Sequence, residues 1–234
     1  MSFQGKNILI VGASSGVGYA LAKTLEAEGA VLFTASRTNP ENLKNQHITW
    51  DVTQPINGIF DALPDVLHGI VYAPGTISLK PFQRFSTVDF QADFQINVLG
   101  AVAVLQANLG RLRKANGASI VLFSTVAVQT GMGFHASIAT SKGAIEGLTR
   151  SLAAEFATAK IRCNALAPSL TDTPLASGLL SSDEKREASA KRHPLGRVGT
   201  PDDIASAAKW LLSDESSWVT GQIIGVDGGI GKLK

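Results

Sequence analysis

Short apolar runs alternate with longer amphipathic segments along the whole chain. The run at 7–11 carries no charged residue and ends at Gly12, a pattern typical of a strand that is buried on both faces in a parallel sheet. Apolar residues then recur at every fourth position from Val17 to Leu25, which is the spacing of one helix face. Because a second apolar run follows at 31–35, these residues are predicted to form a strand–helix–strand unit.

The same alternation continues to the C-terminus. Further strands are predicted at 47–50, 69–72, 119–123, 161–166 and 222–226. Helices are predicted after Pro55, after the capping box at 86–89, over about 92–114 and 137–157, and after the Thr-Pro-Asp-Asp start at 200–203. The segment 174–194 lacks a regular pattern and is interpreted either as a surface insertion or as a mobile lid over a pocket.

Strands and helices that alternate from end to end predict one domain over residues 1–234, a doubly wound α/β fold of the Rossmann type. Seven strands are expected to form a mostly parallel sheet between two helical layers, which gives three layers in all. Ligands on such sheets bind beyond the carboxyl ends of the strands. Functional residues are therefore expected directly after strands.

The composition is that of an ordinary globular protein, because 44% of the residues are hydrophobic and 17% are charged. A net charge of +2 with scattered basic residues does not indicate a nucleic-acid or membrane partner. The single cysteine, Cys163, excludes an internal disulfide and is expected to be a small buried strand residue. The first residues lack the apolar stretch of a signal peptide, so a cytoplasmic protein is predicted.

A glycine-rich turn joins the first strand to the first helix. Glycines at such a turn let the backbone approach a diphosphate closely, and the N-terminus of the following helix favours its negative charge. A plain strand-to-helix connection is the alternative, but the position within the first strand–helix–strand unit favours a dinucleotide site. The residues expected to bind the cofactor here are Gly12, Ser14, Ser15, Gly16, Val17 and Gly18.

The end of the second strand bears on which dinucleotide is bound. An acid that binds the adenosine ribose would be expected about 20 residues after the turn. The sequence has Ser36 and Arg37 there instead, and a guanidinium with a hydroxyl suits a 2′-phosphate, which an acid would repel. NADP(H) is therefore favoured over NAD(H), and a solvated surface arginine is the alternative interpretation of Arg37.

The Gly-x-x-x-Gly-x-Gly turn and later motifs together resemble the short-chain dehydrogenase/reductase family over essentially the whole chain. The matching motifs are Trp-Asp-Val at 50–52, Ile-Asn-Val-Leu-Gly at 96–100, Lys-Gly-Ala at 142–144, Asn-Ala-Leu-Ala-Pro at 164–168 with Thr173, and the segments 196–204 and 220–229. The resemblance implies a Rossmann-type fold, hydride transfer between NAD(P)(H) and a carbonyl or alcohol, and a homodimer or homotetramer.

The resemblance also implies roles for single residues. Lys142 would hold the nicotinamide ribose and lower the pKa of a catalytic tyrosine, and Asn97 would anchor a water in the proton relay. Thr125 stands at the position of the family's serine, which contacts the substrate oxygen. Beyond the glycine-rich turn, Ser36 and Arg37, the residues placed along the cofactor are Asp51, Val52, Ala73, Gly75, Asn97, Lys142, Thr171 and Thr173.

The sequence departs from the family pattern around the chemistry. The family's general acid or base is a tyrosine four residues before the lysine, and Ile138 stands there, which neither donates nor accepts a proton. The serine position, 13 residues earlier, is Thr125, which keeps a hydroxyl, and Ser124 beside it is a second candidate. The family's Asn-Asn-Ala-Gly is replaced by Tyr-Ala-Pro-Gly at 72–75, and Ser169 replaces the glycine after the proline of the sixth strand.

Two functions fit these observations. In the first, the protein is an NADP(H)-dependent oxidoreductase with an atypical proton donor, for which Lys142, directly or through water, and His135 are the candidates. In the second, it is a non-catalytic NADP(H)-binding protein that acts as a redox-responsive or structural partner, because Ile138 removes the acid.

The expected partners are a small apolar carbonyl or alcohol substrate and further copies of this chain, with no metal ion, nucleic acid or membrane. Association rests on the family resemblance and would pack the helices at 101–109 and 145–152 against their symmetry mates. The residues expected to line the substrate pocket are Tyr72, Thr125, Ile138, Leu170 and the segment 174–194.

Overall fold

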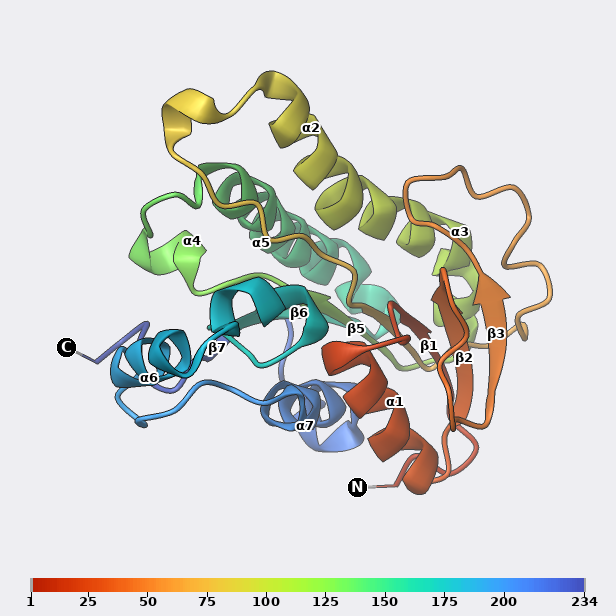
Figure 1. Cartoon of the computed structure of the whole chain (residues 1–234). Coiled ribbons are helices and arrows are strands. Elements are labelled where there is room, and N and C mark those ends of the chain that lie inside the picture. The colour runs from red at the N-terminus through yellow and green to blue at the C-terminus, as the bar shows by residue number, and fades with distance from the viewer. Residues whose placement is uncertain (1, 234) are drawn as a thin grey trace.

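Seven parallel strands form one sheet in the computed structural model, which describes residues 2–233 (Figure 1). The strand order is β3-β2-β1-β4-β5-β6-β7, so the chain starts in the middle of the sheet and winds to one edge and then to the other. This order confirms the doubly wound, Rossmann-type sheet predicted above, with every neighbouring pair parallel. The strands are β1 (Asn7–Val11), β2 (Val31–Ser36), β3 (Asn45–Thr49), β4 (Gly69–Tyr72), β5 (Ala118–Phe123), β6 (Ile161–Pro168) and β7 (Ile223–Val226).

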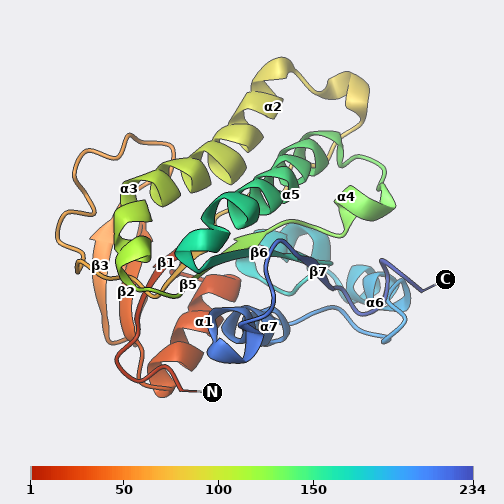
Figure 2. The same ribbon diagram turned by 180° about the vertical axis from the view of Figure 1, so that it is seen from behind.

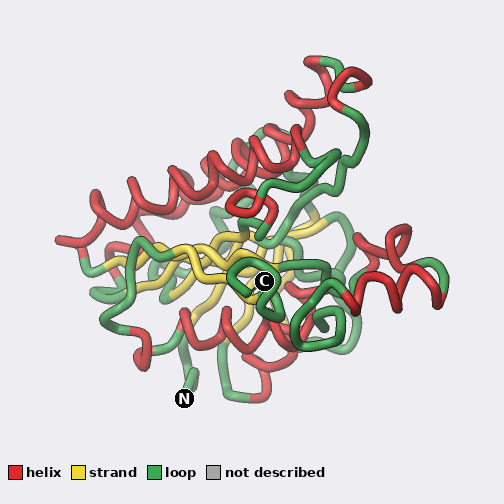
Figure 3. The backbone as a smooth tube through the Cα atoms, turned by 90° about the vertical axis from the view of Figure 1, so that its left-hand side faces the viewer, coloured by secondary structure: helices red, strands yellow, loops and turns green. Residues whose placement is uncertain are grey.

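Helices cover both faces of the sheet and give the three layers that the sequence predicted (Figures 2 and 3). One face carries α1 and α7, and the other carries α2, α3 and α5. The helices are α1 (Gly16–Ala27), α2 (Thr87–Phe94), α3 (Gly100–Lys114), α4 (Ala127–Thr130), α5 (Ala136–Phe156), α6 (Asp183–Lys191) and α7 (Pro201–Leu212), with short helical turns η1 (Phe82–Arg84), η2 (Gln95–Leu99), η3 (Ala157–Ala159), η4 (Pro174–Leu180) and η5 (Asp214–Ser216).

Strand side chains alternate between two hydrophobic cores, because successive residues of a strand point to opposite faces. In β1, Leu9 and Val11 pack with α3 and α5, whereas Ile8 and Ile10 pack with α1 and α7. The prediction for Cys163 is confirmed, since it is fully buried in β6 and burial raises the pKa of its thiol to about 12.

The helices α2 and α3 run into one another through the π-helical turn η2. Together they form a helical segment of 28 residues, 87–114, the one part of residues 2–233 whose length and composition would allow it to cross a membrane. Ala101, Val104 and Leu112 of this segment are fully buried in the core, and 39% of its apolar window is buried in all. The π-helical turn contains Asn97, and such turns occur frequently at functional sites.

The helix predicted after Pro55 is wrong. The residues between β3 and β4 form turns and bends, and Gly58 there adopts a φ of 71°, a left-handed conformation that does not continue a helix. The apolar residues that suggested a helix instead insert singly, with Phe60 and Leu67 buried against the core.

The segment 174–194 was expected to be irregular, but it contains η4 and α6. The side chain of Ser182 accepts a hydrogen bond from the backbone N–H of Lys185 and caps α6. Ser189 is the one buried residue of this helix, so α6 lacks the apolar period by which helices are recognised in sequence.

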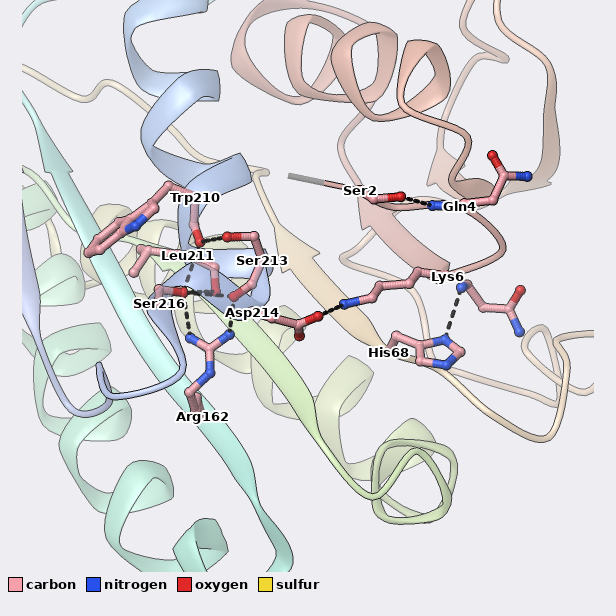
Figure 4. A network of polar contacts seen from close by, with 11 residues as sticks. Ser2, Gln4, Lys6, His68, Arg162, Trp210, Leu211, Ser213, Asp214 and Ser216 are labelled. Carbon is pink, nitrogen blue, oxygen red and sulfur yellow. Dashed lines mark hydrogen bonds and ion pairs between the residues drawn. The ribbon is translucent and has the colours of Figure 1, made fainter.

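At the amino-terminal edge of the sheet, polar side chains tie α7 and η5 to the strands (Figure 4). Arg162, near the start of β6, donates to the hydroxyl of Ser216 at 2.9 Å and to the carbonyl of Ser213 at 3.0 Å. Lys6, just before β1, forms an ion pair of 2.7 Å with Asp214. These contacts close the amino-terminal edge, and the predicted site residues follow the strands at the opposite edge.

Candidate functional site

A cavity of about 850 Å³ lies at the carboxyl edge of the sheet, within the size range of pockets for small ligands and cofactors. It is lined by the segments that follow β1 to β6, and η4 and α6 add one wall. The cavity gathers every residue that the sequence assigned to the cofactor except Asn97, which lies buried behind its wall. Whether η4 and α6 open and close as a lid stays a prediction.

The glycine-rich turn has the close approach and the open helix end that a diphosphate requires. Gly12 adopts a φ of 84°, and a Cβ there would lie 2.9 Å from the backbone nitrogen of Pro74. A Cβ on Gly18 would overlap the carbonyl oxygen of Gly12. Ser15 precedes α1 without a side-chain capping bond, and the first turn carries no acid, so the helix N-terminus is open to an anion. The residues present therefore fit the pyrophosphate of a dinucleotide.

Replacing Gly18 with alanine is expected to destabilise the protein by about 1–3 kcal/mol and to weaken dinucleotide binding, because the added methyl overlaps the Gly12 carbonyl. Chemical denaturation and a calorimetric titration with NADPH would measure both effects. The matched control is Gly110→Ala in α3, where a Cβ meets nothing within 4 Å and about 0.5–1 kcal/mol of stabilisation is expected. Equal behaviour of the two variants would contradict the close approach at the turn.

The far end of the cavity carries the groups expected to recognise the adenosine half of a dinucleotide. Ser36 ends β2 and is buried, with its hydroxyl donating to the carbonyl of Thr38 at 2.8 Å, while Arg37 is exposed at the cavity rim. The backbone N–H and hydroxyl of Thr53 hold the pKa of Asp51 below its ordinary value, and the charge of Arg37 acts in the same direction. A cationic side chain thus stands at the end of β2, beside an ionised Asp51.

At the cavity wall beside Gly75, Asn97 from η2 and Lys142 from α5 approach one place. The amide nitrogen of Asn97 donates to Thr76 Oγ1 at 2.9 Å and to the carbonyl of Asp93 at 2.8 Å, and its oxygen, though buried, has no hydrogen-bond partner among residues 2–233. A Cβ on Gly75 would lie 3.3 Å from that oxygen and 3.5 Å from Lys142 Nζ. The glycine therefore leaves space in which both groups can hold a water or a ribose hydroxyl.

Lys142 is buried in α5, and its Nζ donates to the carbonyl of Phe123 at 2.9 Å. Burial lowers the pKa of Lys142 to about 8, against the opposing effect of the Asp93 carboxylate. The lysine is consequently cationic at neutral pH, though less firmly than an exposed lysine.

The hydroxyl and apolar residues next to Lys142 meet in the same cavity. Thr125 follows β5 and lines the cavity, whereas the neighbouring Ser124 donates its hydroxyl to Glu146 at 2.9 Å. Thr125 makes only long contacts, donating to the carbonyl of Pro168 at 3.5 Å and accepting from the N–H of Ala127 at 3.4 Å, so it is the freer of the two candidate hydroxyls. Ile138, buried in α5 one turn before Lys142, presents an aliphatic side chain to the cavity.

The expectation that Tyr72 lines the pocket is wrong. Its ring lies in the core on the α3 and α5 face, and its hydroxyl donates to the carbonyl of Ile96. The neighbouring Val71 belongs to the other core, so the alternation along β4 directs the tyrosine under η2 instead. The remaining expected lining residues, Thr125, Ile138, Leu170 and part of 174–194, do line the cavity.

One polar pair in the cavity was not foreseen from the sequence. Ser169, directly after β6, lies 2.8 Å from Nε2 of His193, which follows α6. Both line the cavity. The replacement of the family's glycine by Ser169 was the one available signal, whereas His193 stands in a charged stretch without any motif.

The fold and the cavity define a Rossmann-type protein with a cavity at the carboxyl edge of its sheet, and comparisons with known proteins give the family. A family model described as enoyl-(acyl carrier protein) reductase matches residues 12–231. The 3-oxoacyl-(acyl-carrier-protein) reductase FabG of Thermotoga maritima is 32% identical over 98% of this chain and 99% of its own length.

Solved structures of dehydrogenases are also similar to this chain. Ligand-free aldohexose dehydrogenase of Thermoplasma acidophilum superposes with a TM-score of 0.91 at 30% identity, covering 99% of this chain and 96% of that one. A putative NAD(P)-dependent gluconate 5-dehydrogenase from Beutenbergia cavernae, with NADP bound at low occupancy, gives 0.90 at 27% identity and covers 98% of both chains. The chain belongs to the short-chain dehydrogenase/reductase family, whose members similar to it are oxidoreductases.

Proposed function

We propose that this protein is an NADP(H)-dependent oxidoreductase that transfers a hydride between the nicotinamide and a carbonyl or alcohol carbon, with a proton donor other than a tyrosine. The observation that carries the proposal is the meeting of the open glycine-rich turn, Arg37 and Lys142 in one cavity. The family membership supports the reaction class.

Different residues would bind the cofactor and orient the substrate. The turn from Gly12 to Gly18 would hold the pyrophosphate, and Lys142 with Asn97 would hold the nicotinamide ribose and a water beside Gly75. The dinucleotide supplies the hydride when bound. Thr125 would donate a hydrogen bond to the substrate oxygen and thereby orient the carbonyl carbon.

The preference for NADP(H) is supported by the end of β2. Ser36 and Arg37 line the cavity there, and a guanidinium binds a phosphate through charge-assisted hydrogen bonds. NADP is also the dinucleotide in the related structure from Beutenbergia cavernae. The one acidic residue among those of residues 2–233 that line the cavity, Asp51, follows β3 rather than β2.

The substrate proposed is a small apolar carbonyl or alcohol. Besides polar residues, the cavity is lined by several apolar side chains outside the set assigned to the cofactor, and these favour apolar ligands through burial. These side chains are Met132, Ile138, Leu170, Leu175, Leu179 and Ile230.

The proposal is tested by mixing the purified protein with NADPH or NADH and a panel of ketones, aldehydes and diketones, and following absorbance of the reduced nicotinamide. Oxidation of NADPH in preference to NADH is expected with at least one compound. Binding of NADPH by calorimetry without oxidation by any compound would contradict the enzymatic reading.

Ile138 supports a second candidate function, that of a non-catalytic NADP(H)-binding protein. The residue one turn before Lys142 is aliphatic, so the chain has no phenol at that place to move a proton. Under this hypothesis, NADPH binds but its absorbance stays unchanged with every compound of the panel. Binding of NADPH alone then alters the association of the protein with a partner. Turnover of the wild-type protein at ordinary enzyme rates would exclude this function.

We also propose that the chain forms a homodimer or homotetramer. A shallow groove between α2 and α5 is lined by Phe90, Phe94 and Leu99, and the last two expose more than a third of their surface. These side chains lie on α2 and η2, directly before the segment 101–109 that is predicted to pair, and a second copy would cover them. Size-exclusion chromatography with light scattering is expected to give a multiple of 24.5 kDa, and a monomer at dilute concentration would contradict the proposal.

A further inference from the structure

The pair formed by Ser169 and His193 is held in place from both sides of the imidazole. Nε2 of His193 lies 2.8 Å from Ser169 Oγ, and Nδ1 lies 2.8 Å from the carbonyl oxygen of Ser189. The ring is 4% exposed and packs against the backbone at Gly228. Its orientation is therefore fixed by two hydrogen bonds and by packing.

These two contacts determine which ring nitrogen of His193 carries a hydrogen and where the hydroxyl of Ser169 donates. A carbonyl oxygen only accepts, so Nδ1 must carry a hydrogen and donate to Ser189. In the neutral ring Nε2 is then the acceptor, and Ser169 donates its hydroxyl hydrogen to it. A hydroxyl paired with an imidazole in this tautomer can pass a proton in either direction.

The serine stands next to the expected position of the substrate oxygen. The carbonyl of Pro168, directly before Ser169, accepts a hydrogen bond from the backbone N–H of Val126 at 3.0 Å, which places Ser169 beside Thr125 across neighbouring strand ends. Ile138 lines the same cavity from α5. The hydroxyl of Ser169 thus borders the space that an isoleucine leaves without a proton donor.

We propose that Ser169 and His193 form the proton relay of this enzyme, with Ser169 as a catalytic residue and His193 acting through it. The proposal rests on the oxidoreductase function proposed above. In reduction, the hydride adds to the carbonyl carbon and the C=O π pair moves to oxygen. Before reduction, Nε2 takes up one proton from the solvent, and the imidazolium then donates to Ser169 Oγ. The substrate oxygen takes the proton of Ser169, and Ser169 regains one from Nε2, which leaves the ring neutral. Oxidation of an alcohol follows the same steps in reverse.

Other titratable groups in the cavity are placed less well for this step. Lys142 is engaged with Phe123 on the Gly75 side, and His135 is half-exposed at the start of α5 with Nδ1 held by the carbonyl of Gly133. Charged side chains near His193 include Arg192, next to it in the chain, and Asp227, which precedes Gly228 and accepts from the backbone N–H groups of Gly229 and Gly231. The ion pair of Asp172 with Arg186 also lies on elements around the ring.

The salt bridge between Asp172 and Arg186 ties the loop after β6 to α6, the two elements that carry the pair. This contact is half-exposed, so it contributes little to stability but restricts the relative position of the two elements. Arg186 therefore has a positioning role only, since it is not among the described residues that line the cavity.

The test compares wild type with Ser169→Ala, Ser169→Thr, His193→Gln and the exposed control Ser217→Ala, using NADPH and 9,10-phenanthrenequinone, an activated apolar diketone, as the probe. Ser169→Ala is expected to lower kcat about 10²–10⁴-fold with an unchanged Kd for NADPH, and Ser169→Thr, which keeps the hydroxyl, to restore part of it. His193→Gln is expected to lower kcat and to remove the imidazole limb of its pH profile. Thermal melts of each variant separate this loss from unfolding.

The outcomes distinguish the relay from the function on which it rests. A kcat of Ser169→Ala within about threefold of wild type would overturn the relay and leave the oxidoreductase function in place, with Lys142 as the donor to test next. Absence of turnover by wild type that binds NADPH would overturn both. Independently of turnover, long-range ¹H–¹⁵N spectra are expected to show the Nδ1–H tautomer of His193, and an Nε2–H tautomer in the neutral ring would overturn the relay.

Discussion

Replacing Arg37 with glutamate is expected to weaken NADPH binding about 100-fold and to strengthen NADH binding. A charge-assisted hydrogen bond contributes about 1.5–3 kcal/mol, and each 1.4 kcal/mol corresponds to a factor of about ten in Kd. The glutamate would repel the 2′-phosphate of NADPH and accept a hydrogen bond from the 2′-hydroxyl of NADH. Calorimetric titrations of both dinucleotides measure the two effects directly.

The matched control for this prediction is Arg113→Glu, which makes the same change of charge on an exposed residue of α3 that does not line the cavity. Both dinucleotides are expected to bind the control as they bind wild type. If Arg37→Glu left both affinities unchanged, as expected for a solvated surface residue, or weakened NADPH and NADH equally, the assignment of NADP(H) would fail. Added salt should reduce the difference between wild type and Arg37→Glu, because Arg37 is exposed.

The sequence was sufficient for the central strands of the sheet because those strands are buried, unlike β3 and β7 at its edges. In β1 and β5 every residue is buried except the first of β1, which is partly buried, so burial on both faces left a mostly apolar run without charged residues. The helix α6 gave no such signature, since its surface is almost all polar, although Ser182 and the acidic first turn mark its start. Local patterns predict an element only to the extent that the core constrains it.

The site residues likewise divide into those that local sequence patterns predict and those that depend on the fold. Residues of the glycine-rich turn and the end of β2 were predicted because each directly follows or ends a buried strand, β1 or β2. Tyr72 was misplaced because its direction depends on the alternation within β4, which no motif records. The pair of Ser169 and His193 was missed because the two residues are 24 positions apart and meet only when α6 folds over β6.

Introducing a phenol at position 138 is expected to restore catalysis in a protein that has lost Ser169. Ile138 lies one helical turn before Lys142 and faces the cavity, so a tyrosine there would point its hydroxyl towards the space beside Thr125. The neighbouring lysine cation would lower the pKa of that phenol and favour proton transfer. In the Ser169→Ala background, Ile138→Tyr should therefore raise kcat about 10²–10⁴-fold.

The control for size is Ile138→Phe in the same background, which adds the ring without the hydroxyl and should give no recovery. Steady-state kinetics of wild type, each single variant and the double variants complete the cycle. Recovery with tyrosine but not phenylalanine would show that the missing group was a proton donor and nothing else in the cavity. If wild type is inactive and Ile138→Tyr alone creates activity, the natural protein is instead a non-catalytic one. With a working relay of Ser169 and His193, wild type would already be active and the added tyrosine would be redundant.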